Sequence, residues 1–251
     1  MAGAIHGVAM GSIRFPDLNT TVTMHEQLIL LIETATTSCS VALSEGGKVI
    51  AVKEANERNI HASHITLFIE EVMNIAGKLY SELNAVAVSK GPGSYTGLRI
   101  GVSTAKGLCY ALNIPLLSVN TLESMADGLL KTYDLSPSSY LIPMIDARRM
   151  EVYTGIYTTD LTVVEDVNAK IVDQSSFDQF HGDELILFGD GSGKFEELFS
   201  TQPNIKFLDF ENSAAHMASI ADKKLMTGDI ENMAYFEPFY LKDFVAIKAI
   251  K

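Results

Sequence analysis

The stretch Ser89-Lys-Gly-Pro-Gly-Ser-Tyr-Thr-Gly-Leu-Arg-Ile-Gly-Val-Ser-Thr-Ala-Lys-Gly-Leu108 joins an apolar strand, a glycine-rich turn and a small-residue helix without a break. The turn Gly91-Pro-Gly93 ends the strand, because glycine tolerates unusual φ values and proline lacks a backbone donor. Ser94 and Thr96 can cap the following helix, whose first N–H groups would point toward solvent or an anion. The stretch therefore predicts a strand-turn-helix unit that either binds phosphate or only permits close packing.

Two common phosphate-binding motifs do not match this turn. A P-loop ends in Gly-Lys-Ser/Thr, whereas Thr96-Gly97-Leu98 stands at the corresponding place. The glycines at positions 91, 93 and 97 also lack the dinucleotide-binding spacing. Packing and phosphate binding both stay open on the residues alone.

The helix after the turn carries two rows of small residues at four-residue spacing, one at positions 101, 105 and 109 and one at 107 and 111. Such rows let another helix approach closely. The preceding helix, residues 62–78, has apolar side chains at helical intervals. We predict that the two helices form a partner-binding face; the alternative is that their own sheet absorbs both stripes. The predicted face consists of Ile65, Phe68, Ile69, Val72, Leu98, Gly101, Val102, Ala105 and Cys109.

Composition excludes several classes of protein. The chain has 251 residues, 47% of them hydrophobic, and no apolar run long enough to span a bilayer, so we predict no membrane association. A formal charge of −12 disfavours unaided nucleic-acid binding. Cys39 and Cys109 both lie in apolar patterns, which is typical of buried thiols in a reducing compartment and predicts a cytoplasmic protein.

The order of predicted elements indicates two similar halves. Strands are expected at 28–32, 39–44 and 49–52, the last two joined by the hairpin turn at 45–48, and then helix, strand, helix and strand follow. A second set of strands is expected at 140–145, 151–157, 162–167 and 185–188. We predict an α/β protein with two ribonuclease-H-like lobes, each with a mixed five-stranded sheet, facing a cleft. The predicted divisions are 1–23, a non-native or disordered leader; 24–125, the N-terminal lobe; and 126–251, the C-terminal lobe.

Five short motifs recur in one known family. They are Ile32-Glu-Thr-Ala-Thr36, Ser40-Val-Ala-Leu43, the turn and helix start at 91–101, Thr104-Ala-Lys-Gly107 and Ile145-Asp-Ala-Arg148. Together they resemble the bacterial TsaB (YeaZ-like) family. Weaker matches are Gly189-Asp-Gly191 and Glu237-Pro-Phe-Tyr-Leu241. The resemblance implies the actin-like ATPase (ASKHA) fold, in agreement with the predicted lobes.

The resemblance also implies a function. It implies a non-catalytic subunit of the complex that forms N6-threonylcarbamoyladenosine at position 37 of tRNAs reading codons that begin with A. The implied partners are the transferase TsaD, the ATPase TsaE and a TsaC-type enzyme, with tRNA reached only through the complex and a homodimer formed by the chain alone. Two alternatives are a stand-alone ATPase or phosphotransferase of this fold and a metallopeptidase.

The resemblance implies that no metal is bound. TsaD holds a metal with histidines of a His-Met-Glu-Gly-His type segment, where this chain reads Thr121-Leu-Glu-Ser-Met125. Threonine and methionine cannot replace imidazole at such a metal. His61 and His64 are an incomplete ligand set. Asp146 and Glu151 are a candidate pair for general acid/base work or for magnesium; the alternative is that a strand-turn-strand bend simply places a carboxylate there.

Members of this fold usually cradle a nucleotide between two hairpin turns and a glycine-rich turn. The corresponding residues form a predicted vestigial nucleotide site: Thr34, Thr36, Gly91, Gly93, Ser94, Asp146, Gly189 and Gly191. Glu33 stands where ATP-hydrolysing relatives generally use Asp, and a convincing carboxylate set for magnesium is missing. We expect no cofactor in the isolated chain, with ATP or ADP and Mg²⁺ at an interface of the complex left open.

Overall fold

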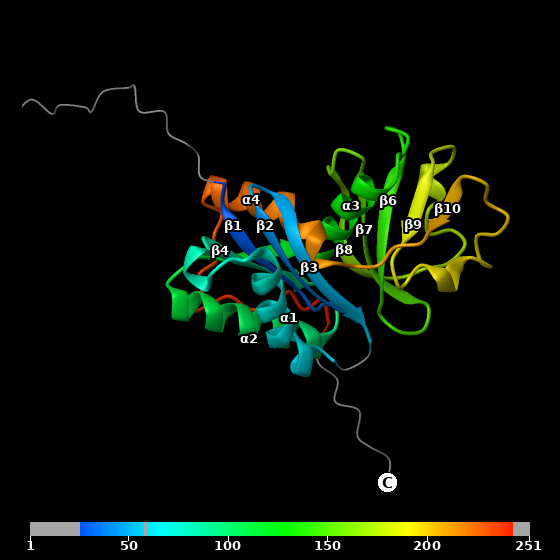
Figure 1. Ribbon diagram of the computed structural model, residues 1–251. Coiled ribbons are helices and arrows are strands. Elements are labelled where there is room, and N and C mark those ends of the chain that lie inside the picture. Colours follow the sequence, from blue (N-terminus) through cyan, green and yellow to red (C-terminus); the bar gives the residue numbers. More distant parts are fainter. Residues whose placement is uncertain (1–25, 58–59, 243–251) are drawn as a thin grey trace, which may run out of the picture.

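Two mixed five-stranded sheets form the two lobes of the protein (Figure 1). The computed structural model describes residues 26–57 and 60–242, so the predicted leader at 1–23 lies outside the described residues. The strand order is β3-β2-β1-β4-β5 in the first sheet and β10-β9-β6-β7-β8 in the second. This arrangement confirms the predicted α/β class with two mixed five-stranded sheets.

The first lobe follows the predicted β-β-β-α-β-α-β order. Its elements are β1 (Leu28–Glu33), β2 (Ser38–Glu45), β3 (Lys48–Asn56), α1 (His61–Ala76), β4 (Ala85–Gly91), α2 (Tyr95–Leu112) and β5 (Leu116–Asn120). The three N-terminal strands are antiparallel, and β4 and β5 are parallel to β1 and to each other. A turn at Gly46 and Gly47, both with positive φ, joins β2 to β3 as the paired glycines predict.

The second lobe repeats this strand plan, with short 3-10 helices in place of α1 and α2. After α3 (Thr121–Thr132) come β6 (Tyr140–Asp146), β7 (Glu151–Thr158), β8 (Val163–Ile171), β9 (Leu185–Phe188) and β10 (Ile205–Leu208). A short 3-10 helix, η4 (Ala214–Met217), then leads into α4 (Ala218–Thr227). No helix within the described ranges combines the length and apolarity needed to cross a membrane.

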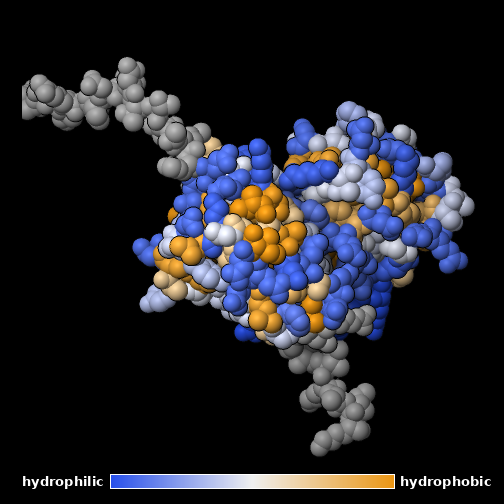
Figure 2. Space-filling model, viewed as in Figure 1, coloured by the Kyte–Doolittle hydropathy of each residue, from blue (hydrophilic) through white to orange (hydrophobic). Residues whose placement is uncertain are grey.

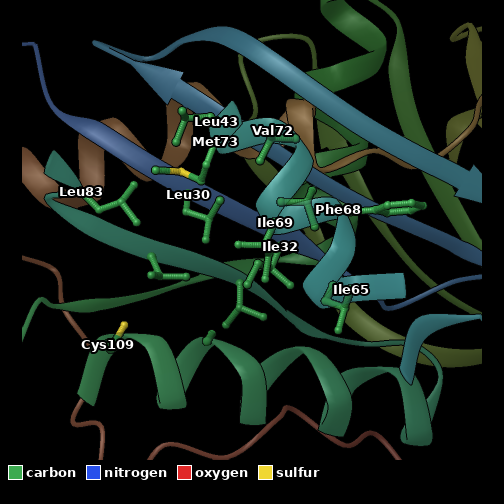
Figure 3. Close-up of a cluster of buried hydrophobic side chains, with 14 of the residues drawn as sticks. Leu30, Ile32, Leu43, Ile65, Phe68, Ile69, Val72, Met73, Leu83 and Cys109 are labelled. Carbon is green, nitrogen blue, oxygen red and sulfur yellow. The ribbon is translucent and has the colours of Figure 1, made fainter. Parts of the chain in front are cut away.

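Helices α1 and α2 cover one face of the first sheet, and their apolar side chains fill the space beneath them. Figure 3 shows side chains of α1 directed toward Leu30 and Ile32 of β1, with Cys109 on the inner side of α2. All nine residues of the predicted partner-binding face are buried. Leu98 lies beside Gly91, Gly101 lies on Thr34, and the other seven lie in the core between the helices and the sheet: Ile65, Phe68, Ile69, Val72, Val102, Ala105 and Cys109. This burial contradicts their placement on an outer face, because the first lobe itself covers the inner stripe of both helices.

The opposite face of the first sheet is covered by a C-terminal segment. Met217 of η4 and Ala218 and Ala221 of α4 pack against Ile29 and Leu31 of β1. The predicted lobe boundary is thus wrong for this segment, because residues 214–227 return to the first lobe instead of completing the second. The apolar positions of α4 indicate at most a helix; they do not show that it packs against a sheet almost 200 positions earlier.

Gly97 and Gly101 of α2 lie directly on the turn that follows β1. A Cβ atom added at Gly97 would overlap the carbonyl oxygen of Thr34, and one at Gly101 would overlap the Thr34 hydroxyl. The N–H of Ser94 donates to the carbonyl of Ala35 over 2.6 Å. These contacts hold α2 so close to the β1–β2 turn that only glycine, which has no side chain, fits at positions 97 and 101. They favour close packing as the role of these glycines.

We expect Gly97→Ala and Gly107→Ala to have opposite effects on stability. Gly97→Ala should lower the free energy of unfolding by about 1–3 kcal/mol, because the methyl group has no room beside the backbone of Thr34. Gly107 lies in the same helix with nothing near its missing Cβ, so alanine there should raise stability by about 0.5–1 kcal/mol. Urea denaturation of both variants tests this; equal effects would contradict the packing role.

Candidate functional site

A cleft of about 850 Å³ lies between the two lobes. Its first-lobe wall includes Thr36 and the start of α2, and its second-lobe wall includes Asp146 and Arg148 of the β6–β7 turn. Four residues near the end of the described chain, at 239–242, complete the lining. The cleft therefore lies at the place that the lobe arrangement predicts.

The predicted nucleotide site is only partly assembled in this cleft. Thr36, Gly93, Ser94 and Asp146 are among its lining residues. The other four predicted residues have packing contacts elsewhere: Thr34 against Gly101, Gly91 beside the carbonyl of Phe239, Gly189 beside Met125, and Gly191 on the carbonyl of Met144. Ser94 caps α2 as predicted, since its hydroxyl accepts from the N–H of Gly97 over 3.3 Å.

Two carboxylates that line the cleft, Asp146 and Asp190, are already paired within the chain, as is Glu151 at the start of β7. Asp146 accepts from the ammonium of Lys194 over 2.5 Å and from the N–H of Arg148 over 3.1 Å. Glu151 pairs with Lys242, and Asp190 accepts from the N–H of Asp146 over 3.0 Å. Magnesium requires several free oxygen ligands. Lysine ammonium groups already pair with Asp146 and with Glu151.

Glu33 is fully buried at the end of β1. Its Oε1 accepts from the N–H of Ala35 over 2.5 Å and from the hydroxyl of Ser89 over 2.9 Å. Burial raises the pKa of Glu33 above its usual 4.5, although these hydrogen bonds oppose the rise. The carboxyl group binds the turn under α2 instead of facing the cleft.

The residues weighed as metal ligands have other roles. Thr121 and Met125 are buried at the start of α3, and the Met125 methyl group lies 2.5 Å from the position of a Cβ at Gly189. The ring of His61 meets the carbonyl of Ser38, and that of His64 meets the hydroxyl of Ser63. Among the described residues, no group of three or more His, Cys, Asp or Glu is placed to hold a metal ion.

A second hollow, of about 520 Å³, runs between α1 and α2 on the outside of the first lobe. Its lining consists of Ala62, Ile65, Thr66, Tyr95, Thr96, Arg99, Ile100, Ser103 and Thr104. The outward residues of the two helices include Leu67, Ile75 and Tyr110, which are 50%, 64% and 81% exposed. Figure 2 shows hydrophobic surface over α1 and a larger hydrophobic patch over β3. The outer surface of the helix pair thus retains apolar side chains beyond those used in the core.

Sequence reasoning missed four residues that shape the cleft: Tyr95, Arg148, Tyr240 and Lys242. Tyr240 lies within the motif at 237–241, which was noted only as part of the family resemblance. Its contact with Tyr95, at 4.9 Å between ring centroids, joins positions 145 residues apart. Nothing in the local pattern indicates such a contact.

Comparison with known proteins shows the family and the fold of this chain. Over 231 residues the chain is 31% identical to the tRNA threonylcarbamoyladenosine biosynthesis protein TsaB of Escherichia coli (strain K12), covering 88% of this chain and 97% of that protein. YeaZ from Pseudomonas aeruginosa superimposes with a TM-score of 0.73 at 25% identity, over 86% of this chain and 100% of that one. Residues 48–223 match the family described as TsaD: tRNA N6-adenosine threonylcarbamoyltransferase. TsaD of Bacillus subtilis (strain 168) is 37% identical over 112 residues, 38% of this chain and 32% of that protein.

The paired lobes, each with a mixed five-stranded sheet, define a protein of the actin-like ATPase fold. Component A of the Acidaminococcus fermentans (R)-2-hydroxyglutaryl-CoA dehydratase shares this fold at a TM-score of 0.51 and 10% identity, over 80% of this chain and 99% of that one. Within this class, the chain belongs to the TsaB family. The resemblance predicted from the motifs is confirmed.

The raised pKa of Glu33 predicts a pH-dependent effect of Glu33→Gln. A raised pKa means that the fold favours the protonated carboxyl, so this contribution to stability is present below about pH 4.5 and is lost as the pH rises through the folded-state pKa. Glutamine keeps an Oε1 acceptor and never ionises. The variant should match the wild type near pH 4.5 and be more stable at pH 8, as measured by urea denaturation.

The matched control for this experiment is Glu70→Gln, at an exposed position on α1. Its stability difference from the wild type should stay constant over the same pH range. A constant difference for Glu33→Gln as well would show that Glu33 does not carry the effect.

Proposed function

We propose that this chain is a non-catalytic subunit of the complex that forms N6-threonylcarbamoyladenosine in tRNA. Its full-length relatives carry the name tRNA threonylcarbamoyladenosine biosynthesis protein TsaB. In this proposal it pairs with TsaD and, with TsaD, recruits TsaE, while a TsaC-type enzyme supplies the activated group. The protein acts in the cytoplasm and reaches tRNA only through the complex, because a formal charge of −12 repels phosphate.

The observation that carries the proposal is the outer surface of α1 and α2. The inner small-residue row is buried, but the second row, Gly107 and Ala111, is exposed, and nothing lies within 4 Å of a Cβ at Gly107. Tyr110 beside this row is 81% exposed. A partner helix can approach closely over the small residues while the tyrosine ring packs at its side.

The match to TsaD indicates the form of the partner. Residues 48–223 include both helices, so a TsaD-type protein has a counterpart of the pair. Two copies of one chain can pack through the same surface about an exact two-fold axis. Two related chains can pack their matching helix pairs in the same way about an approximate two-fold axis. The same surface therefore accounts for a TsaD heterodimer and for a homodimer of the chain alone.

The arrangement of the cleft supports a non-catalytic role. Asp146 and Glu151 are neutralised by lysines, and Met125 fills space against Gly189 where the resemblance places a metal ligand of TsaD. A catalytic centre needs groups free to meet substrate in a defined geometry. We propose that nucleotide, if it is used, binds at an interface of the complex and not to the isolated chain.

The docking proposal predicts that Gly107→Arg and Ala111→Arg abolish binding to TsaD. Both side chains would project from the outer face of α2 into the interface, whereas the isolated chain has room for them. Melting temperatures should stay within a few degrees of the wild type, while binding measured by calorimetry falls at least 100-fold. Gln179→Arg, exposed on the second lobe, is the matched control. Wild-type affinity of Gly107→Arg would exclude this face as the interface.

Val102→Arg, which alters the inner stripe, should behave differently. Val102 lies on the inner side of α2 and is only 5% exposed. A charged side chain there would be buried without a partner and should destabilise the fold by several kcal/mol. Loss of soluble, cooperatively unfolding protein is the expected outcome, in place of selective loss of binding. A stable Val102→Arg protein that fails only to bind TsaD would restore the inner stripe as the interface.

A further inference from the structure

The described chain ends in a segment that crosses from the first lobe to the second. Residues 236–242 are here called the C-terminal strap. They run alongside α2 in space, and the last of them, Lys242, contacts the first residue of β7. In Figure 1 this red segment runs beside α2 under the first lobe. Four of its residues, 239–242, line the cleft between the lobes.

The strap is firmly attached to the first lobe. Phe236 is buried in the core beneath α1 and α2, and its carbonyl accepts from the ammonium of Lys106 over 2.9 Å. The N–H of Phe239 donates to the carbonyl of Lys90 over 2.7 Å. These contacts combine apolar burial with backbone hydrogen bonding, so the first half of the strap belongs to the first lobe.

Gly91 is shaped to receive the strap. Its φ of +109° favours glycine, and a Cβ at this position would lie 2.7 Å from the carbonyl oxygen of Phe239. This glycine of the turn motif therefore contacts the chain's own C-terminal segment. A larger residue would push the strap away from the end of β4.

The strap reaches the second lobe through a partly exposed ion pair. The ring of Tyr240 packs on Tyr95, the first residue of α2, and Lys242 then pairs with Glu151 of β7. The Lys242 side chain is 40% exposed. An ion pair of this kind shifts an equilibrium by about fivefold at most. The attachment to the second lobe is thus much weaker than the attachment to the first.

We propose that the C-terminal strap is a releasable latch that holds the two lobes closed across the mouth of the cleft. In the latched state Tyr240 covers the start of α2 and Lys242 neutralises Glu151. Release frees the Glu151 carboxylate and uncovers the first turn of α2 and the β6–β7 turn. The latch does not depend on the proposed docking of TsaD. Tyr95 also lines the groove between α1 and α2, so, if the docking proposal holds, the latch state also alters one end of that groove.

Hydrogen exchange of the full chain tests the latch. Lys242→Glu replaces the ion pair by repulsion and should speed amide exchange in residues 146–151 by about two- to fivefold. The reversed pair, Lys242→Glu with Glu151→Lys, should restore the wild-type rate. Lys223→Glu, exposed on α4, makes the same change of charge elsewhere and should leave these amides unaffected. Wild-type exchange in Lys242→Glu, or no recovery in the reversed pair, would overturn the latch.

A pair of shortened chains tests the whole strap. A chain ending at Glu237 keeps Phe236 and its contact with Lys106 but loses the latch, whereas a chain ending at Lys242 keeps it. The shorter chain should exchange more than fivefold faster in residues 95–98 and 146–151, with the amides of β1 unchanged as evidence of an intact fold. Equal exchange of the two chains would overturn the proposal. Faster exchange throughout β1 as well would show a general structural role and would also overturn it.

Discussion

Helix α2 lies with its glycine face directly on the backbone of the β1–β2 turn, and the rest of the first lobe depends on this contact. Because Gly97 and Gly101 have no side chain, the helix can lie directly on Thr34 at the end of β1. Close approach also buries the carboxyl of Glu33, which binds the N–H of Ala35 and the hydroxyl of Ser89 beneath the helix. The glycine-rich motif therefore works as a packing device.

The position of α2 determines which surfaces remain available for function. One side of the helix is used up in the core with α1 and the first sheet, and the opposite side, with Gly107, Tyr110 and Ala111, faces outward. The N-terminal end of α2 borders the cleft, where Tyr95 meets Tyr240. The proposed docking face and one wall of the cleft thus belong to the same helix. Asp146 and Glu151 on the second lobe each pair with a lysine, which is consistent with the proposed role in association.

The sequence patterns predicted the fold well and the site only in part. Strand runs such as 28–32, the paired glycines at 46–47 and the two amphipathic helices are local signals, and they gave the correct order of elements. The pattern did not distinguish the inner row of α2 from the outer one, because both rows contain small residues and either could face a sheet or a partner. Helix α4 and the C-terminal strap were missed because their partners lie far away in the sequence. The same holds for the lysines that neutralise Asp146 and Glu151.

The central claim is that the carboxylates of the cleft do no chemistry in tRNA modification. The most direct measurement is threonylcarbamoyladenosine formation by the reconstituted proteins with an Asp146→Asn and Asp190→Asn double variant of this chain, which keeps the shape of both side chains. The account predicts a rate within twofold of the wild type at saturating concentrations of the partners. A loss of tenfold or more, with binding to TsaD unchanged, would show that these carboxylates hold a metal or substrate and would contradict the account.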